Sequence, residues 1–150
     1  MDCFQSNPDV QFLLKLHYKD YTDENKDYIA EVLKDYIKQK NIFIVIQNLD
    51  QKELLSFHSV GDCYLSLHKG EAFGLVIHEA FSYKKPVITN KYGGQVDFLG
   101  YSYPYLVNYN MELVKNMEHF SCWYDGDQYW GVPNLEEAKK LMIKVYNENR

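Results

Sequence analysis

Residues 62–89, DCYLSLHKGEAFGLVIHEAFSYKKPVIT, decide the fold class of this chain of 150 residues. The apolar residues at 62–67 predict a strand, and the helical spacing at 73–83 predicts a helix. Residues 86–89 predict a second strand that begins with a proline, where proline is tolerated. A strand, a helix and a strand in this order are typical of an α/β domain with a parallel sheet.

The same alternation continues on both sides of this stretch. Asp50 with Glu53, and Asn134 with Glu137, have the spacing of a capping box at the start of a helix. Residues 109–133 predict no clear element. The other expected elements are strands at 11–17, 42–46 and 105–107, with helices at about 22–38, 50–60 and from Asn134 onward. We therefore predict a Rossmann-like three-layer α/β domain with a mostly parallel sheet of about five strands.

The amino-acid composition argues against several classes of function. Sixteen Lys and Arg against twenty-one Asp and Glu give a net charge of −5, which argues against non-specific nucleic-acid binding. Cys3, Cys63 and Cys122 show no C-x-x-C spacing, so we expect neither a disulfide framework nor a cysteine-built zinc site. No apolar run approaches the roughly 20 residues of a membrane helix. We expect neither a signal peptide nor a membrane-spanning segment, and a cytoplasmic location.

The candidate site begins where the strand at 62–67 ends, because ligands bind at the carboxyl ends of strands in open α/β sheets. Gly70 and Gly74 allow the backbone to approach a ligand closely. We expect the N–H groups of Phe73, Gly74 and Leu75 to be free at the start of the next helix. Together with the helix dipole they would form a site for a phosphate.

Glu79 follows on that helix among apolar neighbours, from which we expect the helix to be largely buried. A buried carboxylate is costly unless it is hydrogen-bonded, and sugar or ribose hydroxyls would satisfy it. Leu75, Glu79 and Ser82 share one face, and Glu71 lies in the loop before the helix. A solvated glutamate and a simple glycine turn are the alternative interpretations.

Other chemistries have weaker support. His68, Glu71, His78 and Glu79 match no standard metal-binding spacing, so we expect no metal site. Neither G-x-G-x-x-G nor a P-loop motif occurs. Cys63 is expected in the core.

Residues 62–99 resemble the donor-binding motif of retaining GT-B glycosyltransferases of the group-one class (glycosyltransferase family four). The pair Glu71 and Glu79 matches the two glutamates of that motif. The residues at 86–89 match its strand, and Gly93-Gly94 match its glycine-containing loop. The resemblance extends more weakly over about 10–146, including the closing stretch that contains Trp130, Pro133 and Asn134.

The resemblance implies a role for each matching residue. Glu71 would contact the hydroxyls of the donor sugar and is the catalytic candidate, and Glu79 would bind the ribose of the nucleotide. The amides around Phe73, Gly74 and Leu75 would face the sugar and the pyrophosphate. Asn48 and Leu49 would lie near the base. The family implies a nucleoside-diphosphate sugar as substrate, and no cofactor or metal for the transfer.

The resemblance also implies what the chain lacks. We expect residues 1–150 to form one domain that binds the donor, without the N-terminal acceptor domain and without the first strand of the donor-binding domain. A second chain or domain would then supply the acceptor site. The chain by itself would bind donor weakly, transfer no sugar and tend to self-associate. Lys84 stands where glycine usually ends the helix, so the helix must end on a residue other than glycine.

Two further interpretations stay open besides a glycosyltransferase that transfers sugar to a hydroxyl with retained configuration. The first is a non-catalytic module that binds a nucleotide-sugar or completes another chain. The second is a fragment of a nucleotide-sugar epimerase, which has the same fold. The sequence does not specify the sugar, the base or the acceptor.

Overall fold

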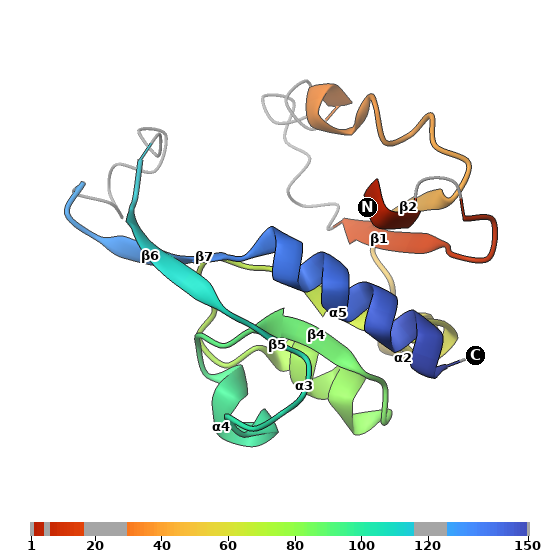
Figure 1. Cartoon of the computed structure of the whole chain (residues 1–150). Helices are drawn as coiled ribbons and strands as arrows, with labels where there is room; N and C mark the ends of the chain where they lie inside the picture. The colour runs from red at the N-terminus through yellow and green to blue at the C-terminus, as the bar shows by residue number, and fades with distance from the viewer. Residues whose placement is uncertain (1, 5–6, 17–29, 116–125, 150) are drawn as a thin grey trace. The chain divides into compact units, whose positions relative to one another are not determined.

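A computed structural model of the chain describes residues 2–4, 7–16, 30–115 and 126–149 (Figure 1). The chain divides into two compact units, Met1–Phe57 and His58–Arg150, and each is described by itself. Helix α2 (Gln51–Val60) crosses the boundary between the two units. Within the described residues, no helix has both the length and the apolar character needed to cross a membrane.

The first unit contains a parallel pair of strands. β1 (Phe12–Leu16) and β2 (Ile42–Ile46) pair along their whole length, and both were expected from the sequence. Ile42 is buried, but Phe43 is 45% exposed and Ile46 is 41% exposed. A continuous apolar run such as residues 42–46 is typical of a strand buried on both faces, but β2 is not buried in this way. A pair of strands offers each side chain fewer neighbours than the middle of a wide sheet would.

The predicted helix at 22–38 is described only in part, because residues 17–29 lie outside the described residues. Residues 30–33 are helical and residues 34–38 form turns, so the helix ends before Lys38. The helix expected at 50–60 is confirmed as α2. Its capping box closes in both directions, since Glu53 N donates to Asp50 Oδ1 at 2.7 Å and Asp50 N donates to Glu53 Oε2 at 2.9 Å.

The second unit is built on a three-stranded parallel sheet in the order β3-β4-β5. Its strands are β3 (Tyr64–Ser66), β4 (Val87–Asn90) and β5 (Leu106–Val107), and its helices are α3 (Leu75–Ser82), α4 (Gln95–Leu99) and α5 (Leu135–Glu148). All three strands coincide with predicted ones. The α/β class with parallel strands is confirmed, although the expected strands are divided between this sheet and the β1–β2 pair.

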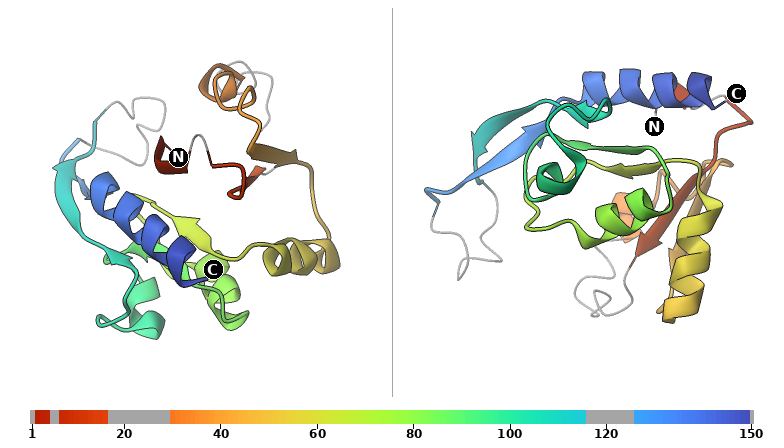
Figure 2. Two further views of the ribbon diagram at one scale, coloured as in Figure 1. Left: turned by 45° about the vertical axis from the view of Figure 1, so that its right-hand side comes forward. Right: turned by 90° about the horizontal axis from the view of Figure 1, so that it is seen from below.

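The two faces of this sheet carry separate clusters of buried side chains. Val87 packs with Ile77 and Ala80 of α3 on one face. Ile88, the next residue of β4, packs with Ala138 and Val145 of α5 on the other face. Successive strand residues point to opposite faces, so β4 contributes to both clusters. The sheet therefore lies between α3 and α5 in a three-layer arrangement (Figures 1 and 2).

An antiparallel strand pair that the sequence did not predict follows β5. β6 (Tyr109–Leu113) pairs with β7 (Tyr129–Pro133), from Tyr109 opposite Pro133 to Leu113 opposite Tyr129. Most side chains of β6 are exposed, and β7 contains a glycine and ends on a proline. Both residue types are depleted in strands, which explains why the pattern gave no signal.

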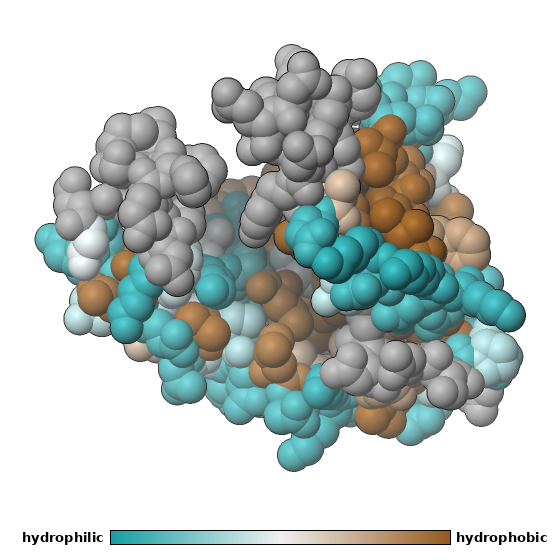
Figure 3. Space-filling view, turned by 90° about the horizontal axis from the view of Figure 1, so that it is seen from above, coloured by the Kyte–Doolittle hydropathy of each residue, from teal (hydrophilic) through white to brown (hydrophobic). Residues whose placement is uncertain are grey.

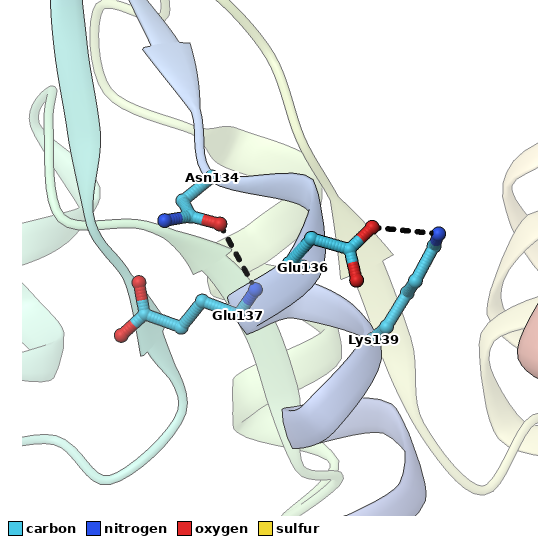
Figure 4. A network of polar contacts seen from close by, with 4 residues as sticks. All are labelled: Asn134, Glu136, Glu137 and Lys139. Carbon is cyan, nitrogen blue, oxygen red and sulfur yellow. Dashed lines mark hydrogen bonds and ion pairs between the residues drawn. The ribbon is translucent and has the colours of Figure 1, made fainter.

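Helix α5 begins at the predicted cap. Asn134 Oδ1 accepts a hydrogen bond from Glu137 N at 3.0 Å, and Glu136 pairs with Lys139 at 2.9 Å on the outer side (Figure 4). Glu137 does not complete the capping box. Its two carboxylate oxygens accept instead from the backbone N–H and the side-chain amide of Asn108, at 2.8 and 2.9 Å. The cap is thus confirmed, and its partner residue fastens α5 to the end of β5.

Candidate ligand-binding site

The candidate site lies where β3 and β4 end, at the carboxyl edge of the sheet in the second unit. The loop of residues 67–74, here called the glutamate loop, follows β3 and leads into α3. The loop of residues 91–94, here called the glycine loop, follows β4 and leads into α4. Because β3 and β4 are parallel neighbours, their following loops emerge at the same edge.

The two loops pack backbone against backbone. Gly94 N donates to Ala72 O at 2.9 Å. A Cβ on Gly94 would lie 2.0 Å from that oxygen, and a Cβ on Gly93 would lie 2.8 Å from Glu71 O. Gly93 also has a backbone φ of 107°, which residues other than glycine rarely adopt. Gly93 and Gly94, which match the family motif, are therefore needed because the two loop backbones approach each other too closely for a side chain.

Glu71 is held by its own loop. One carboxylate oxygen, Oε1, accepts a hydrogen bond from Gly74 N at 3.1 Å. Gly74 has φ 79° and precedes α3, which begins at Leu75 rather than at residue 73. The expectation that the Gly74 N–H is free is therefore wrong, because Glu71 already accepts its hydrogen bond. The helix dipole favours a carboxylate at this position near the N-terminus of a helix. The neighbouring Phe73 is 52% exposed and Leu75 is 61% exposed.

Glu79 is held by a residue that the sequence reasoning missed. Glu79 Oε2 lies 3.3 Å from His58 Nε2 at the end of α2, and the His58 side chain is only 5% exposed. The His58 ring stacks on Tyr83 at 6.4 Å between centroids and lies at the same distance from Tyr64. No local pattern could have indicated His58, because its partner is twenty-one positions away in the sequence (79 − 58 = 21).

Helix α3 is less buried than expected. Ile77 and Ala80 are 2% exposed, whereas Leu75, Val76 and Phe81 are 61%, 44% and 37% exposed. Apolar neighbours of Glu79 in sequence therefore do not place it inside the protein, and its side chain is 33% exposed. Exposed hydrophobic side chains also occur outside α3. On the face drawn in Figure 3, hydrophobic side chains reach the surface between hydrophilic ones.

The phenol group of Tyr64 is affected by the charges of both glutamates. Its pKa is raised, mainly because burial disfavours the phenolate, and further because the negative charges of Glu71 and Glu79 act on it. Both carboxylates therefore add to the effect of burial on this one phenol group.

Strand β7 contacts the glutamate loop as well. Gly131 N donates to Lys69 O at 3.0 Å, and the ammonium of Lys69 lies 4.3 Å from the centre of the Trp130 ring. A cation over an indole face is stabilised by the quadrupole of the ring. Trp130, which the resemblance assigned to the closing stretch, therefore contacts the glutamate loop directly.

Other candidate residues do not belong to the glutamate loop or the glycine loop. Asn48 and Leu49, expected near a base, belong to the first unit. His78 packs against Phe73 and Phe98 with ring centroids 5.7 and 5.1 Å apart. In the described ranges, no three His, Cys, Asp or Glu residues gather in a way that could hold a metal ion.

Cys63 packs against the Ile88 and Val145 cluster, as expected for a core residue. Burial raises the pKa of its thiol to about 11. The thiolate, which is the reactive form, is therefore scarce at neutral pH.

These features define a Rossmann-like α/β domain with a candidate site at the carboxyl edge of its parallel sheet. A family model described as glycosyl transferases group 1 matches residues 19–116, about two thirds of the chain. The chain therefore belongs to the group 1 glycosyl transferases. The match includes both glutamates and the glycine loop but ends before Trp130 and Asn134. No match to the chain was found among curated proteins.

Proposed function

We propose that the second unit binds the nucleoside-diphosphate sugar donor of a retaining GT-B glycosyltransferase of family four. The chain would then be the donor-binding half of an enzyme that transfers the sugar to a hydroxyl acceptor. The observation that carries this proposal is the close packing of the glutamate loop against the glycine loop at the carboxyl edge of the sheet, which sets Glu71 beside the start of α3. Membership of the group 1 glycosyl transferases supports it.

Each part of the site would bind a different part of the donor. Glu79, 33% exposed and at the side of α3, would accept hydrogen bonds from the ribose hydroxyls. Glu71, at the mouth of the loop, would accept them from the sugar. The amides of Phe73, Gly74 and Leu75 would face the pyrophosphate, where the positive end of the α3 dipole also acts. The pyrophosphate would then displace the Glu71 carboxylate from Gly74 N.

The transfer itself would depend on positioning and electrostatics. The bond between the anomeric carbon and the phosphate oxygen breaks, and the nucleoside diphosphate leaves with the bonding electrons. The acceptor oxygen forms the new bond, and its proton passes to the leaving phosphate or to solvent. Amides and the helix dipole beside the leaving phosphate would stabilise its growing charge. A second chain or domain would hold the acceptor at the correct distance. We propose no metal in this reaction.

A ligand panel tests the proposal directly. The purified chain is heated with UDP-, GDP- and ADP-sugars, and the strongest stabiliser is then titrated by calorimetry. We expect one base to be preferred and the sugar-bearing donor to bind more tightly than the free diphosphate. The absence of stabilisation by every nucleotide sugar at millimolar concentration would contradict the proposal. Turnover of the donor with an acceptor distinguishes an enzyme from a module that only binds.

A further inference from the structure

His58 is a buried ring that two tyrosines hold in place. It lies in the last turn of α2 and is the first residue of the second unit. The imidazole stacks on Tyr83, just beyond α3, with an angle of 13° between the ring planes, and it meets Tyr64 of β3 at 53°. Contacts with two large rings restrict how the imidazole can turn. The direction of its ring nitrogens is therefore restricted as well.

The carboxylate of Glu79 lies against this ring and stays accessible. Glu79 Oε2 is 3.3 Å from His58 Nε2, whereas the Glu79 side chain is 33% exposed. The imidazolium cation can donate toward a carboxylate oxygen, and so can the neutral ring with its proton on Nε2. The contact uses one of the two carboxylate oxygens. A ligand can therefore still reach the carboxylate while His58 holds it.

Holding a glutamate before a ligand arrives should raise the affinity for that ligand. A long side chain that turns freely loses rotamer freedom when a ligand orders it, and this loss opposes binding. For one such side chain the loss amounts to about tenfold in affinity. A carboxylate that His58 has already ordered avoids most of this loss.

We propose that His58 is a positioning residue, which holds the Glu79 carboxylate in place for the hydroxyl groups of a ribose. His58 itself touches no ligand in this proposal and acts only through Glu79. The part that concerns the ribose rests on the proposed function, whereas the ordering of Glu79 by His58 does not. The competing role for His58 is to fill the space beside Tyr64 and Tyr83.

Two variants separate the donor nitrogen of His58 from its ring. His58→Phe keeps an aromatic ring beside Tyr83 but has no nitrogen. His58→Gln has no ring, but its amide nitrogen lies the same number of bonds from Cβ as Nε2 does, so it can donate toward Glu79. A positioning role requires the donor, whereas a packing role requires the ring.

The first measurement is made without ligand. Three-bond NMR couplings of the β- and γ-protons of Glu79 show whether its side chain keeps one rotamer or averages over several. We expect one rotamer in the unaltered chain and in His58→Gln, and averaging in His58→Phe. Averaging in the unaltered chain, or a single rotamer in His58→Phe, would overturn the proposal, whatever the chain binds.

The second measurement titrates UDP, GDP or ADP, whichever the ligand panel prefers, and follows the binding by NMR, which also measures weak affinities. The affinity should fall about five- to tenfold in His58→Phe and stay within about threefold of the original in His58→Gln. In the Glu79→Ala background, His58→Phe should change the affinity by less than about twofold, because no carboxylate is left to position. An equal loss in both backgrounds would overturn the proposal.

Val145→Ala is the control for stability, because it weakens the core cluster that faces α5. It should lower the melting temperature while leaving the affinity within about twofold of the original. A chain that binds UDP, GDP or ADP equally well with and without His58→Phe would keep the proposed function but overturn the positioning role. If the unaltered chain binds no nucleotide, the proposed function fails, and the Glu79 couplings still decide whether His58 orders Glu79.

Discussion

Glu71 and Glu79 are the two glutamates of one sequence motif, but the structure holds them by different means. Around Glu71, backbone lies against backbone, and the carboxylate accepts from Gly74 N only three residues away. Around Glu79, side chain lies against side chain, and the partner is His58 from another helix. The position of Glu71 is therefore set by the steric fit of the two loop backbones. The position of Glu79 is set by its contact with His58 and by the packing of the His58 ring. Substitutions of the glycines beside Glu71 should therefore affect stability, whereas substitutions of the two glutamates should affect ligand binding.

The largest effect should come from Gly94→Ala at the Glu71 end. The new Cβ would lie 2.0 Å from Ala72 O, so a backbone must move and the Gly94 N–H loses its partner. We expect a loss of about 3 kcal/mol or more in the free energy of unfolding, measured with urea. Gly70→Ala is the control, because nothing lies within 4 Å of its Cβ. Similar stability of the two variants would show that the loops do not pack closely.

The next effect should come from Glu79→Ala, which removes the proposed acceptor for the ribose hydroxyls. We expect nucleoside-diphosphate affinity to fall roughly 5- to 150-fold, or about 1–3 kcal/mol, while the fold persists. Calorimetry gives the affinity, and circular dichroism confirms the fold. Glu136→Ala makes the same change of charge on the outer side of α5 and should leave the affinity unchanged. Equal affinities in all three proteins would remove Glu79 from the site.

A more selective effect is expected from Glu71→Ala. The free nucleoside diphosphate should bind about as well as before, because the substitution also releases the Gly74 N–H for a phosphate. The preference for the sugar-bearing donor should disappear. Calorimetry with both ligands side by side measures this difference. Equal weakening of both ligands would instead place Glu71 beside the nucleotide.

The smallest effect should come from Lys84→Gly, just beyond α3 and away from both loops. Lys84 has φ 58°, and among the described residues it alone has a positive φ without being glycine. Glycine adopts this conformation without strain, so we expect a gain of about 0.5–1 kcal/mol in stability, measured with urea. Lys85→Gly should give no such gain. A loss of stability in Lys84→Gly would mean that side-chain contacts of Lys84 outweigh the backbone strain.

The sequence predicted the features that depend on neighbours within a few positions. Apolar runs located β1, β2, β3, β4 and β5, and cap spacing located the starts of α2 and α5. The expected helix end without glycine is confirmed by Lys84. Strand runs and caps are local because the hydrogen bond or the side-chain spacing that defines each spans only a few residues.

Tertiary structure alone decided how the glutamates are held and how deeply α3 is buried. His58 reaches Glu79 and Gln95 reaches His68 across more than twenty residues, and only the folded sheet brings such groups together. Glu137 could have completed its capping box, as Glu53 does, but Asn108 offers it two donors at the end of β5. A sequence pattern states which partners a residue has nearby along the chain. Packing decides which of the available partners it binds, because a buried polar group binds the donors and acceptors that the fold places around it.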